Sequence, residues 1–294
     1  MSRYRFIHAE RASYPVTLLC RVLGVVRSAY DAWARHKVSA RATADEALAA
    51  QIAAAHARSR RTHGAPRIHA ELRAGGVRCA RKRVARLLRT MSLVGCYRRR
   101  RTRTTVADPN RAPALNLVAR DFTAAAPDRL WIGDSTFVPT REGWRYLAVL
   151  LDVYSRRVIG WAMADHLRAE LTLDALAMAL QTHRPPPGLV HHTDRGGQYT
   201  AAVYRAILAS SGVTASMSRA GECLDNAVAE SFFATLKAQL IDPQAWPTRA
   251  AARTVIFAWI EVWYNRQRRH SALGYRAPVA HEEQHLLLLQ DLAA

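Results

Sequence analysis

Three acidic residues of this chain, Asp134, Asp194 and Glu230, lie where their carboxylates could act together. Asp134 lies in a strand-like run, Asp194 directly follows a short apolar segment, and Glu230 lies in a stretch with helical periodicity. Carboxylates are hard oxygen ligands for Mg²⁺ or Mn²⁺, and two such ions about 3.5–4 Å apart can activate a nucleophile and stabilise a leaving oxygen in phosphodiester chemistry. The three residues are therefore candidate catalytic residues and candidate ligands for two divalent ions.

The helical stretch around Glu230 indicates which face that residue presents. Glu230 projects about 200° away from the apolar stripe, at roughly 100° per residue, and the stripe consists of Val228, Phe232 and Leu236. Asn226 and Lys237 are expected on the same exposed face as Glu230, where they could contact a phosphate backbone. Helix geometry alone nevertheless favours an ordinary solvated acid at position 230.

Other polar residues compete for the same role. Asp152 also lies in a strand-like run, but it precedes the turn segment 155–157, so turn capping or local ion pairing explains it better than metal binding. His191 and His192 are potential transition-metal ligands, yet neighbours in a strand point to opposite faces and cannot easily chelate one ion. We expect one of these histidines in the core and the other near the path of the phosphodiester substrate. The residues after Asp194 supply two more candidate DNA contacts, Gln198 and Tyr199.

The segments that carry these acids predict an α/β domain. The run LWIGDSTFV from residue 130 is strand-like, residues 146–155 are almost continuously apolar, and 157–163 follow after a short turn, so an antiparallel meander is expected. Helix and strand patterns alternate beyond it, with a helix at 168–184, a strand at 189–193, a helix at 199–210, a strand at 213–217 and helices at 225–240 and 248–265. This alternation predicts a sheet with helices packed on it.

Positive charge is concentrated in the first part of the chain. The 294 residues include 43 Lys and Arg against 23 Asp and Glu, a formal net charge of +20. Residues 1–120 hold 26 basic and 6 acidic side chains, whereas residues 121–294 hold 17 of each. Such an excess is typical of a polyanion-binding protein, because each neutralised phosphate releases counterions. A merely soluble basic surface is the alternative, and a membrane surface fits less well because no lipidation motif accompanies the charge.

Two helix-turn-helix patterns lie within this basic part. Residues 15–36 show two helical periods separated by Gly24, and residues 66–94 show two more separated by Gly75 and Gly76. The second helix of the latter unit carries candidate DNA contacts at Arg81, Lys82, Arg83 and Arg86. A helical hairpin with a solvated basic face is the alternative for either unit alone, but two in succession favour DNA binding.

Two further segments add candidate DNA contacts. Residues 97–120 are rich in Arg and poorly periodic, which predicts a basic linker with candidates at Arg98, Arg99, Arg100 and Arg101. The segment 264–276 mixes basic and aromatic residues, as phosphate contact with stacking requires, and its candidates are Arg266, Arg268, Arg269 and His270. A solvated helix end is the alternative for this second segment.

These patterns divide the chain into five parts. They are an N-terminal helix-turn-helix region at 1–60, a second helix-turn-helix-like unit at 61–96, a basic linker at 97–122, an α/β catalytic core with its C-terminal helices at 123–280 and a tail at 281–294. The apolar run at 285–292 is too short to cross a membrane, so we expect it to pack against a neighbour.

The cysteines and the N-terminus indicate the compartment. Four isolated cysteines form no Cys-x-x-Cys pair, which argues against a disulfide framework and a zinc knuckle. The N-terminus lacks the apolar core of a signal peptide, and no run of 18 apolar residues occurs. A reduced cytoplasmic location, at the nucleoid, is expected.

Several long phrases of the chain resemble one family, the OrfB transposases of the third insertion-sequence (IS3) family, which are relatives of the retroviral integrases. The phrases span nearly the whole chain and read SYPVTLLCRVLGV, GAPRIHAELR, DRLWIGDSTFVPT, LAVLLDVYSRRVIGWAM, HHTDRGGQYT, LDNAVAESFFATLK and YNRQRRHSALGYRAP. The DDE catalytic triad of that family falls on Asp134, Asp194 and Glu230, with 35 residues between the last two.

The resemblance implies an RNase H-like catalytic core preceded by an all-α helix-turn-helix region. It further implies two-metal DNA strand transfer, in which water cleaves a phosphodiester at the element end and the freed 3′-hydroxyl attacks another strand, through a circular DNA intermediate. No covalent bond between enzyme and DNA is expected. The family also implies double-stranded DNA as partner, a homo-oligomer on that DNA, and fusion by frameshifting to an upstream-frame protein.

The sequence departs from the family pattern at three positions. In the loop before the catalytic helix, Ala220 replaces a usual Lys and Glu222 replaces a usual Asn. The loop thus loses a positive charge that would attract phosphate and gains a negative charge that repels it. Val26 replaces a usual Ser near the start of the recognition helix, which removes a helix cap. These changes leave the triad intact and weaken the expectation of strong DNA binding.

The sequence therefore predicts a metal-dependent DDE transposase. Two alternatives are a non-catalytic DNA-binding remnant or repurposed regulator, and a simple RNase H-like nuclease that cuts without joining.

Overall fold

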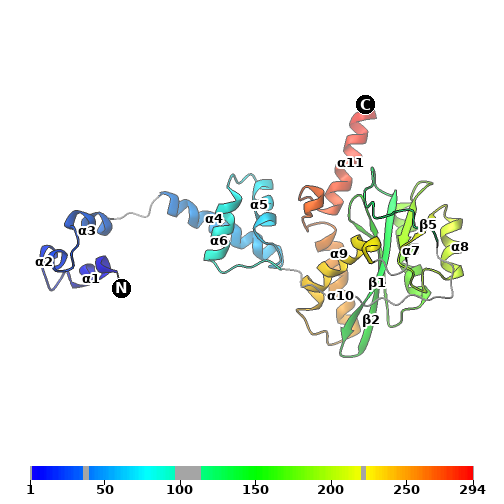
Figure 1. Cartoon of the computed structure of the whole chain (residues 1–294), viewed down its shortest axis with the longest axis horizontal. Coiled ribbons are helices and arrows are strands. Elements are labelled where there is room, and N and C mark those ends of the chain that lie inside the picture. Colours follow the sequence, from blue (N-terminus) through cyan, green and yellow to red (C-terminus); the bar gives the residue numbers. More distant parts are fainter. Residues whose placement is uncertain (1, 36–39, 97–113, 220–222, 294) are drawn as a thin grey trace.

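The computed structural model describes residues 2–35, 40–96, 114–219 and 223–293. Along the chain, two helical units are followed by an α/β domain, as Figure 1 shows. Among the described residues, no helix combines the length and the apolar character needed to cross a membrane.

The first helical unit contains α1 (Arg3–Glu10), α2 (Val16–Val22) and α3 (Arg27–Ala34). Its small core is built from Ile7, Leu19, Cys20 and Tyr30. The helix-turn-helix predicted for residues 15–36 is confirmed as α2 and α3, and Gly24 in their turn has a φ of +61°. Val26 is the N-cap residue of α3 and makes no capping hydrogen bond, as its apolar side chain predicts. Helix α1 was not predicted, because its segment has little amphipathic pattern.

The second helical unit contains α4 (Ala40–Arg58), α5 (Ala65–Ala74) and α6 (Arg81–Thr90). Helices α5 and α6 confirm the second predicted pair, with the break at Gly75 and Gly76. Helix α4 packs on both of them in one core that contains Leu48, Ile52, Ile68, Leu72, Val84 and Leu87. Helix α4 lies before the predicted division at residue 60 but packs with the helices after it; the division itself stays a prediction. The sequence of α4 is rich in Ala, so its apolar stripe is weak and only the packing shows which helices share the core.

The α/β domain is built on a five-stranded sheet with the order β3-β2-β1-β4-β5. Its strands are β1 (Leu130–Thr140), β2 (Gly143–Asp152), β3 (Val158–Ala164), β4 (Val190–Thr193) and β5 (Thr214–Met217). The first three strands pair in antiparallel fashion, which confirms the predicted meander. Strand β4 pairs parallel with β1, and β5 pairs parallel with β4.

Helices cover both faces of the sheet. Helices α7 (Ala169–His183) and α8 (Ala202–Ser210) pack on one face around Trp131 and Leu150. Helices α9 (Ala227–Leu236) and α10 (Arg249–Ala258) pack on the other face around Ile132 and Leu151. Neighbouring residues of β1 and β2 thus serve opposite cores, as the alternation of side chains in a strand requires. The predicted strand–helix order is confirmed.

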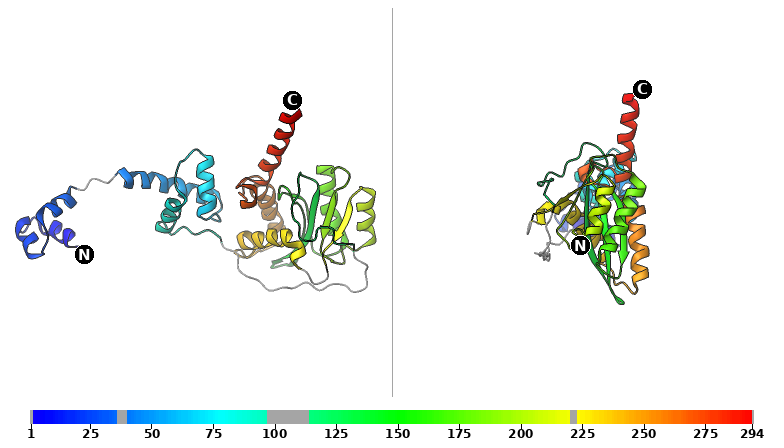
Figure 2. Two further views of the ribbon diagram at one scale, coloured as in Figure 1. Left: turned by 45° about the horizontal axis from the view of Figure 1, so that its top comes forward. Right: turned by 90° about the vertical axis from the view of Figure 1, so that its right-hand side faces the viewer.

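Short helical turns and one long helix complete the domain. They are the 3₁₀ turns η1 (Cys223–Asn226) and η4 (Ser271–Leu273), the π-helical turns η2 (Lys237–Ile241) and η3 (Trp259–Tyr264), and the helix α11 (Pro278–Ala293). The first part of α11 is anchored by an Arg157–Glu282 ion pair of 2.6 Å. Its later part projects away from the sheet (Figure 2), and Leu286, Leu287, Leu288 and Leu289 are all at least half exposed. Packing of this tail against a neighbour stays a prediction.

Gly160 in β3 lets α7 lie close against the sheet. A Cβ added at Gly160 would lie 2.2 Å from the carbonyl oxygen of Ala175 and 2.8 Å from the Cβ of Ala179. We predict that Gly160→Ala lowers the free energy of unfolding by about 2 kcal/mol, because helix backbone cannot yield as a flexible side chain can. Chemical denaturation tests this against Gly197→Ala, since nothing lies within 4 Å of a Cβ at Gly197. Equal stability of the two variants would contradict close packing of α7.

The second helical unit contacts the C-terminal elements of the α/β domain. The Arg67 Nε donates a hydrogen bond of 2.9 Å to the carbonyl oxygen of Arg269. The rings of His63 and Trp263 lie 5.3 Å apart between centroids. The Cys96 thiol donates to the carbonyl oxygen of Ala238 over 3.2 Å. These contacts join α5 and the end of the second unit to η2, η3 and the segment after them.

Candidate active site

Asp134 and Asp194 lie at matching levels of neighbouring strands. Asp134 is in β1, and Asp194 directly follows β4. The two strands are parallel and Ile132 pairs with His192, so two residues further along the chain the carboxylates come side by side. Neighbouring strands are about 4.8 Å apart, which brings both groups within the reach of one ligand.

Backbone N–H groups hold the two carboxylates in place. The N–H of Ser135 donates to Asp134 Oδ1 over 2.7 Å. The N–H of Gly196 donates to Asp194 Oδ1 over 2.9 Å, in the tight turn that follows β4. Each carboxylate therefore has one oxygen fixed by the chain.

Glu230 approaches from α9, which packs on the sheet beside β1. The predicted apolar stripe is confirmed, because Val228, Phe232 and Leu236 are buried in the core while Glu230 is exposed. The prediction for Asn226 is wrong: this side chain is only 5% exposed, and its Nδ2 donates to the carbonyl oxygen of Gly133 over 3.4 Å. The residue lies in the turn η1 before α9, so the helical face counted from Glu230 does not extend to it.

The charges of Asp194 and Glu230 both act on the carboxyl group of Asp134. Burial raises the pKa of Asp134 well above its usual range, and the charges of Asp194 and then Glu230 add to the rise. The Ser135 hydrogen bond and the Lys237 charge lower the pKa of Asp134. Burial also raises the pKa of Asp194, against the Gly196 hydrogen bond. A buried carboxyl group whose pKa is raised by neighbouring carboxylates, as that of Asp134 is, favours a bound cation.

The part of the chain that the structure describes contains no set of three His, Cys, Asp or Glu side chains gathered tightly enough to hold a metal ion. The two aspartates are paired by the sheet, and the glutamate stands on a separate helix. The donor set is carboxylate oxygen alone, which is the chemistry that Mg²⁺ and Mn²⁺ prefer.

The other candidates near the acids have structural roles. Asp152 is fully buried and accepts hydrogen bonds from the N–H groups of Asp128 and Ser155, which confirms turn capping. His191 and His192 point to opposite faces as predicted, but both are buried, so neither side chain can contact DNA directly. His191 Nε2 contacts the Tyr204 hydroxyl over 2.8 Å.

The residues after Asp194 pack behind the carboxylates. Gln198 Nε2 donates to Ser135 Oγ over 3.3 Å. Tyr199 is 1% exposed, so its prediction as a DNA contact is wrong. Burial and the charge of Asp134 raise the pKa of the Tyr199 hydroxyl, which places that group close to the carboxylates.

Asp225 in η1 is a residue that the sequence did not single out. Its carboxylate is fully buried and accepts from Arg219 through the backbone N–H, Nε and Nη2, each over 3.0 Å. Arg120 and Asn116 donate to the same carboxylate over 3.1 and 2.8 Å. The carbonyl oxygen of Asp225 also contacts His192 Nε2 over 2.9 Å. This cluster connects the strand that precedes Asp194 to the start of the helix that carries Glu230.

The predicted basic contacts in α6 divide into two kinds. Arg81 and Lys82 are exposed. Arg83, which is half-buried, and Arg86, which is exposed, form ion pairs of 2.6 and 2.5 Å with Asp45 of α4. The predicted contacts Arg98, Arg99, Arg100 and Arg101 lie outside the described residues, as do Ala220 and Glu222.

The predicted basic contacts of the catalytic domain also differ in accessibility. Arg266 is exposed, whereas Arg268 is 4% exposed and its guanidinium lies over the Tyr264 ring. Arg269 donates to the carbonyl oxygen of Tyr275, and His270 contacts Arg268. The Lys237 ammonium lies 4.8 Å from the centre of the Phe137 ring.

Comparison with known families matches most of the chain. The description "Integrase core domain" fits residues 124–223 in one model and 211–278 in another, and "HTH-like domain" fits residues 43–101. The last of these begins within α4, in agreement with the packing of that helix.

Among curated proteins, two relatives cover almost the whole chain. The insertion element IS600 uncharacterized 31 kDa protein of Shigella sonnei is 44% identical over 268 residues, which cover 91% of this chain and 98% of that protein. Transposase InsF for insertion sequence IS3A of Escherichia coli (strain K12) is 40% identical over 286 residues, which cover 97% and 99%.

Solved structures with partial similarity include two viral proteins. An intasome of simian T-cell lymphotropic virus in complex with PP2A regulatory subunit B56 gamma matches with a TM-score of 0.46 and 15% identity, over 60% of each chain. The integrase catalytic core domain of HTLV-2 in complex with magnesium matches with a TM-score of 0.41 and 17% identity, over 54% of this chain and 99% of that one.

Proposed function

This chain belongs to the family of IS3 insertion-sequence transposases, and from that premise we propose that Asp134, Asp194 and Glu230 are the catalytic triad with which it cleaves and joins DNA. The observation that carries the assignment is the placement of two aspartates side by side on parallel strands, where burial raises the pKa of Asp134 and the charges of Asp194 and Glu230 raise it further. Asp152, the acid at the end of β2, instead caps the backbone N–H groups of Asp128 and Ser155.

The three carboxylates offer the oxygen donors that a divalent ion prefers, although among the described residues they are not gathered around one point. Asp134 and Asp194 would share the ions, and Glu230 would complete the coordination from α9. When bound, two Mg²⁺ or Mn²⁺ ions supply an activated oxygen nucleophile and neutralise charge on the leaving oxygen. The N–H groups of Ser135 and Gly196 fix one oxygen of each aspartate, and the second oxygen of each would serve as the metal ligand.

The proposed reaction has two steps at one centre. In the first, the oxygen of water attacks a phosphorus at the element end, and the bond to the 3′ oxygen breaks to leave a 3′-hydroxyl and a 5′-phosphate. In the second, that 3′-hydroxyl attacks a phosphorus of another strand and displaces its 3′ oxygen. Lys237, which acts electrostatically on Asp134, adds a positive charge where the phosphate must lie.

DNA binding is assigned to the helical units and the exposed basic residues. Arg81 and Lys82 of α6 and Arg266 are exposed and positioned for phosphate contacts. Arg83 and Arg86 can contribute only in competition with Asp45. A homo-oligomer on DNA, fusion to an upstream-frame protein and action at the cytoplasmic nucleoid complete the proposal.

A strand-transfer assay tests this function. The DNA on either side of the reading frame is sequenced for terminal inverted repeats, and a duplex of one end is incubated with the protein, MgCl₂ and a supercoiled target. We expect both nicked ends and joined products. Nicked ends without joining would favour the nuclease alternative, and bound but unreacted DNA would favour the non-catalytic remnant.

A further inference from the structure

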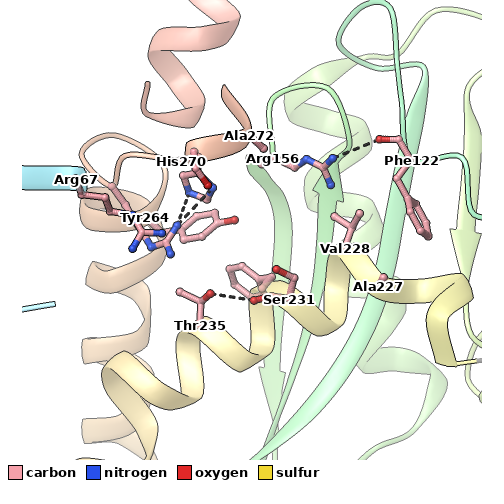
Figure 3. A pocket seen from close by; sticks show the side chains of 13 residues that line it. Arg67, Phe122, Arg156, Ala227, Val228, Ser231, Thr235, Tyr264, His270 and Ala272 are labelled. Carbon is pink, nitrogen blue, oxygen red and sulfur yellow. Dashed lines mark hydrogen bonds between the residues drawn. The ribbon is translucent and has the colours of Figure 1, made fainter. Parts of the chain in front are cut away.

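A cavity of about 340 Å³ lies where α9 meets the second helical unit. Figure 3 shows its lining: Arg67 from α5 on one side, Arg156 from the turn after β2 on the other, and Ser231 and Thr235 of α9 along the floor. Three parts of the chain that are far apart in sequence therefore meet around one space. None of the proposed catalytic residues lines it.

The lining of this cavity is strongly basic. It contains the guanidinium groups of Arg67, Arg156 and Arg268 together with His270, and among the described residues no carboxylate lines it. Several like charges around one space repel one another unless an anion is present. Burial, followed by the charges of Arg268, Arg67 and Arg156, lowers the pKa of His270 well below its usual range, because protonation would add a further positive charge beside the three guanidinium groups.

The guanidinium groups are held in place by the protein. Arg67 Nε donates to the carbonyl oxygen of Arg269 over 2.9 Å, and Arg156 Nη2 donates to that of Phe122 over 3.3 Å. Arg268 contacts His270 Nε2 over 2.9 Å and lies over the Tyr264 ring. Because these contacts restrict the side chains, little conformational entropy remains to be lost when an anion binds. Guanidinium is also the cation best suited to phosphate oxygens.

The part of the cavity lined by α9 consists of small side chains, two of which carry a hydroxyl group. Ala227, Ser231 and Thr235 follow one another at four-residue intervals and form a row of small side chains about 12 Å long at 1.5 Å per residue. Glu230 stands on the next row of the same helix, roughly 100° from Ser231. A DNA strand whose reacting phosphate lies at Glu230 can therefore place another phosphate in the cavity.

We propose that this cavity binds a backbone phosphate of the reacting DNA strand, through Arg67 of the second helical unit and through Arg156 and Arg268 of the catalytic domain. The inference rests on the function proposed above, and it adds a binding site formed only when the two units meet. One phosphate of a DNA strand held there contacts both the second helical unit and the catalytic domain. Cleavage therefore requires that α5 is docked correctly on the catalytic domain.

A second basic hollow extends the basic surface from the cavity toward α6. It is about 450 Å³ in volume and lies between the second unit and the segment 269–276. Its lining includes Arg73, Arg81, Arg269 and Arg276, and again no carboxylate from the described residues. Arg81 is the first residue of α6, so basic side chains continue from the cavity to that helix.

Inorganic phosphate tests the cavity without DNA. Thermal unfolding is measured with sodium phosphate against sodium chloride at equal ionic strength and pH. We expect the unfolding temperature of the wild type to rise by about 3 °C when the phosphate concentration is ten times the dissociation constant. Arg67→Gln should show no such rise. Ser231→Glu should melt higher than the wild type without phosphate and then fail to respond, because its carboxylate takes the place of the anion. Arg205→Gln and Ser210→Glu, at exposed positions of α8, are the matched controls.

Two results of this experiment would overturn the proposal. One is a wild type that responds to phosphate no more than to chloride. The other is an equal response in the wild type and in both cavity variants, which would place the phosphate elsewhere.

Neutral DNA linkages test whether the phosphate belongs to DNA. Element-end duplexes are prepared with a single methylphosphonate at each successive position of the reacting strand. We expect one position at which the neutral linkage slows wild-type cleavage about tenfold but has no effect on Arg67→Gln, which itself is about tenfold slower on unmodified DNA.

The outcomes separate the cavity from the proposed function. Wild-type cleavage with identical methylphosphonate profiles in both proteins would overturn the DNA phosphate site while leaving the transposase function intact. A phosphate-induced thermal gain with identical profiles would assign the cavity to a free phosphate instead. No wild-type cleavage of unmodified DNA would contradict the proposed function, and the thermal experiment would still decide whether the cavity binds phosphate.

Discussion

Asp194→Asn is expected to abolish both DNA cleavage and strand joining, by at least about 1000-fold, while DNA binding is retained. The variant keeps the size and shape of the side chain but removes the charge that a divalent ion needs. The helical units and the basic residues around Arg81 are unchanged, so the affinity for the element end should stay within about twofold. Cleavage and joining are measured as above, and binding is measured by gel shift.

The same substitution should change the stability of the metal-free protein. Asp194 raises the pKa of Asp134, so at neutral pH the two aspartates destabilise the fold when no cation is bound. A carboxyl group whose folded pKa is raised costs stability as the pH rises above its unfolded pKa of about 3.9. Asp194→Asn therefore unfolds at a higher temperature than the wild type without metal, and MnCl₂ stabilises the wild type but not Asp194→Asn.

Asp174→Asn is the matched control, because it removes the same charge from an exposed position of α7. The control should retain cleavage, joining and the response to MnCl₂. Full activity of Asp194→Asn would remove Asp194 from the triad. Equal stabilisation of the wild type and Asp194→Asn by MnCl₂ would place the metal elsewhere.

Asp225→Ala is expected to lower the free energy of unfolding by about 3 kcal/mol. The fully buried carboxylate accepts hydrogen bonds from Arg219, Arg120 and Asn116, and its removal leaves those donors around an empty site. The cluster also fixes the start of α9 relative to β4. Activity should therefore fall even where the variant remains folded, because Glu230 is no longer held at the same place.

The pH dependence identifies the source of this stability. The hydrogen bonds from Arg219 hold the pKa of Asp225 far below its usual range. A group with a depressed folded pKa contributes its full stability above the unfolded pKa, and the contribution is lost as the pH falls through the folded value. The difference between the wild type and Asp225→Ala should be constant above about pH 5 and should shrink steadily below about pH 4.

Urea denaturation from pH 2 to 7 measures this difference, with Asp174→Ala as the control for loss of a surface acid. A stability difference that does not shrink in acid would show that Asp225 acts through packing and not through its charge. Asp225→Asn keeps the shape of the side chain and should lose less stability than the alanine variant.

Local sequence patterns predicted most of the catalytic domain. The run LWIGDSTFV, the apolar segment after it and the alternation beyond residue 168 correspond to β1, β2 and the elements that follow. These segments are long and strongly patterned, so the period of their apolar residues distinguishes helix from strand. The first helical region was predicted less well, because α1 and α4 have weak amphipathic patterns and are defined by what they pack against.

The sequence by itself determined the family, the candidate triad and the basic character of the DNA-binding part, because residue types and their spacing carry that information along the chain. The tertiary structure alone decided which polar groups face solvent. It buried Asn226 and Tyr199, paired Arg83 and Arg86 with Asp45, and assembled Arg67, Arg156 and Arg268 around one cavity. Burial and charge pairing depend on residues that are distant in sequence, so no local period or motif could have revealed them.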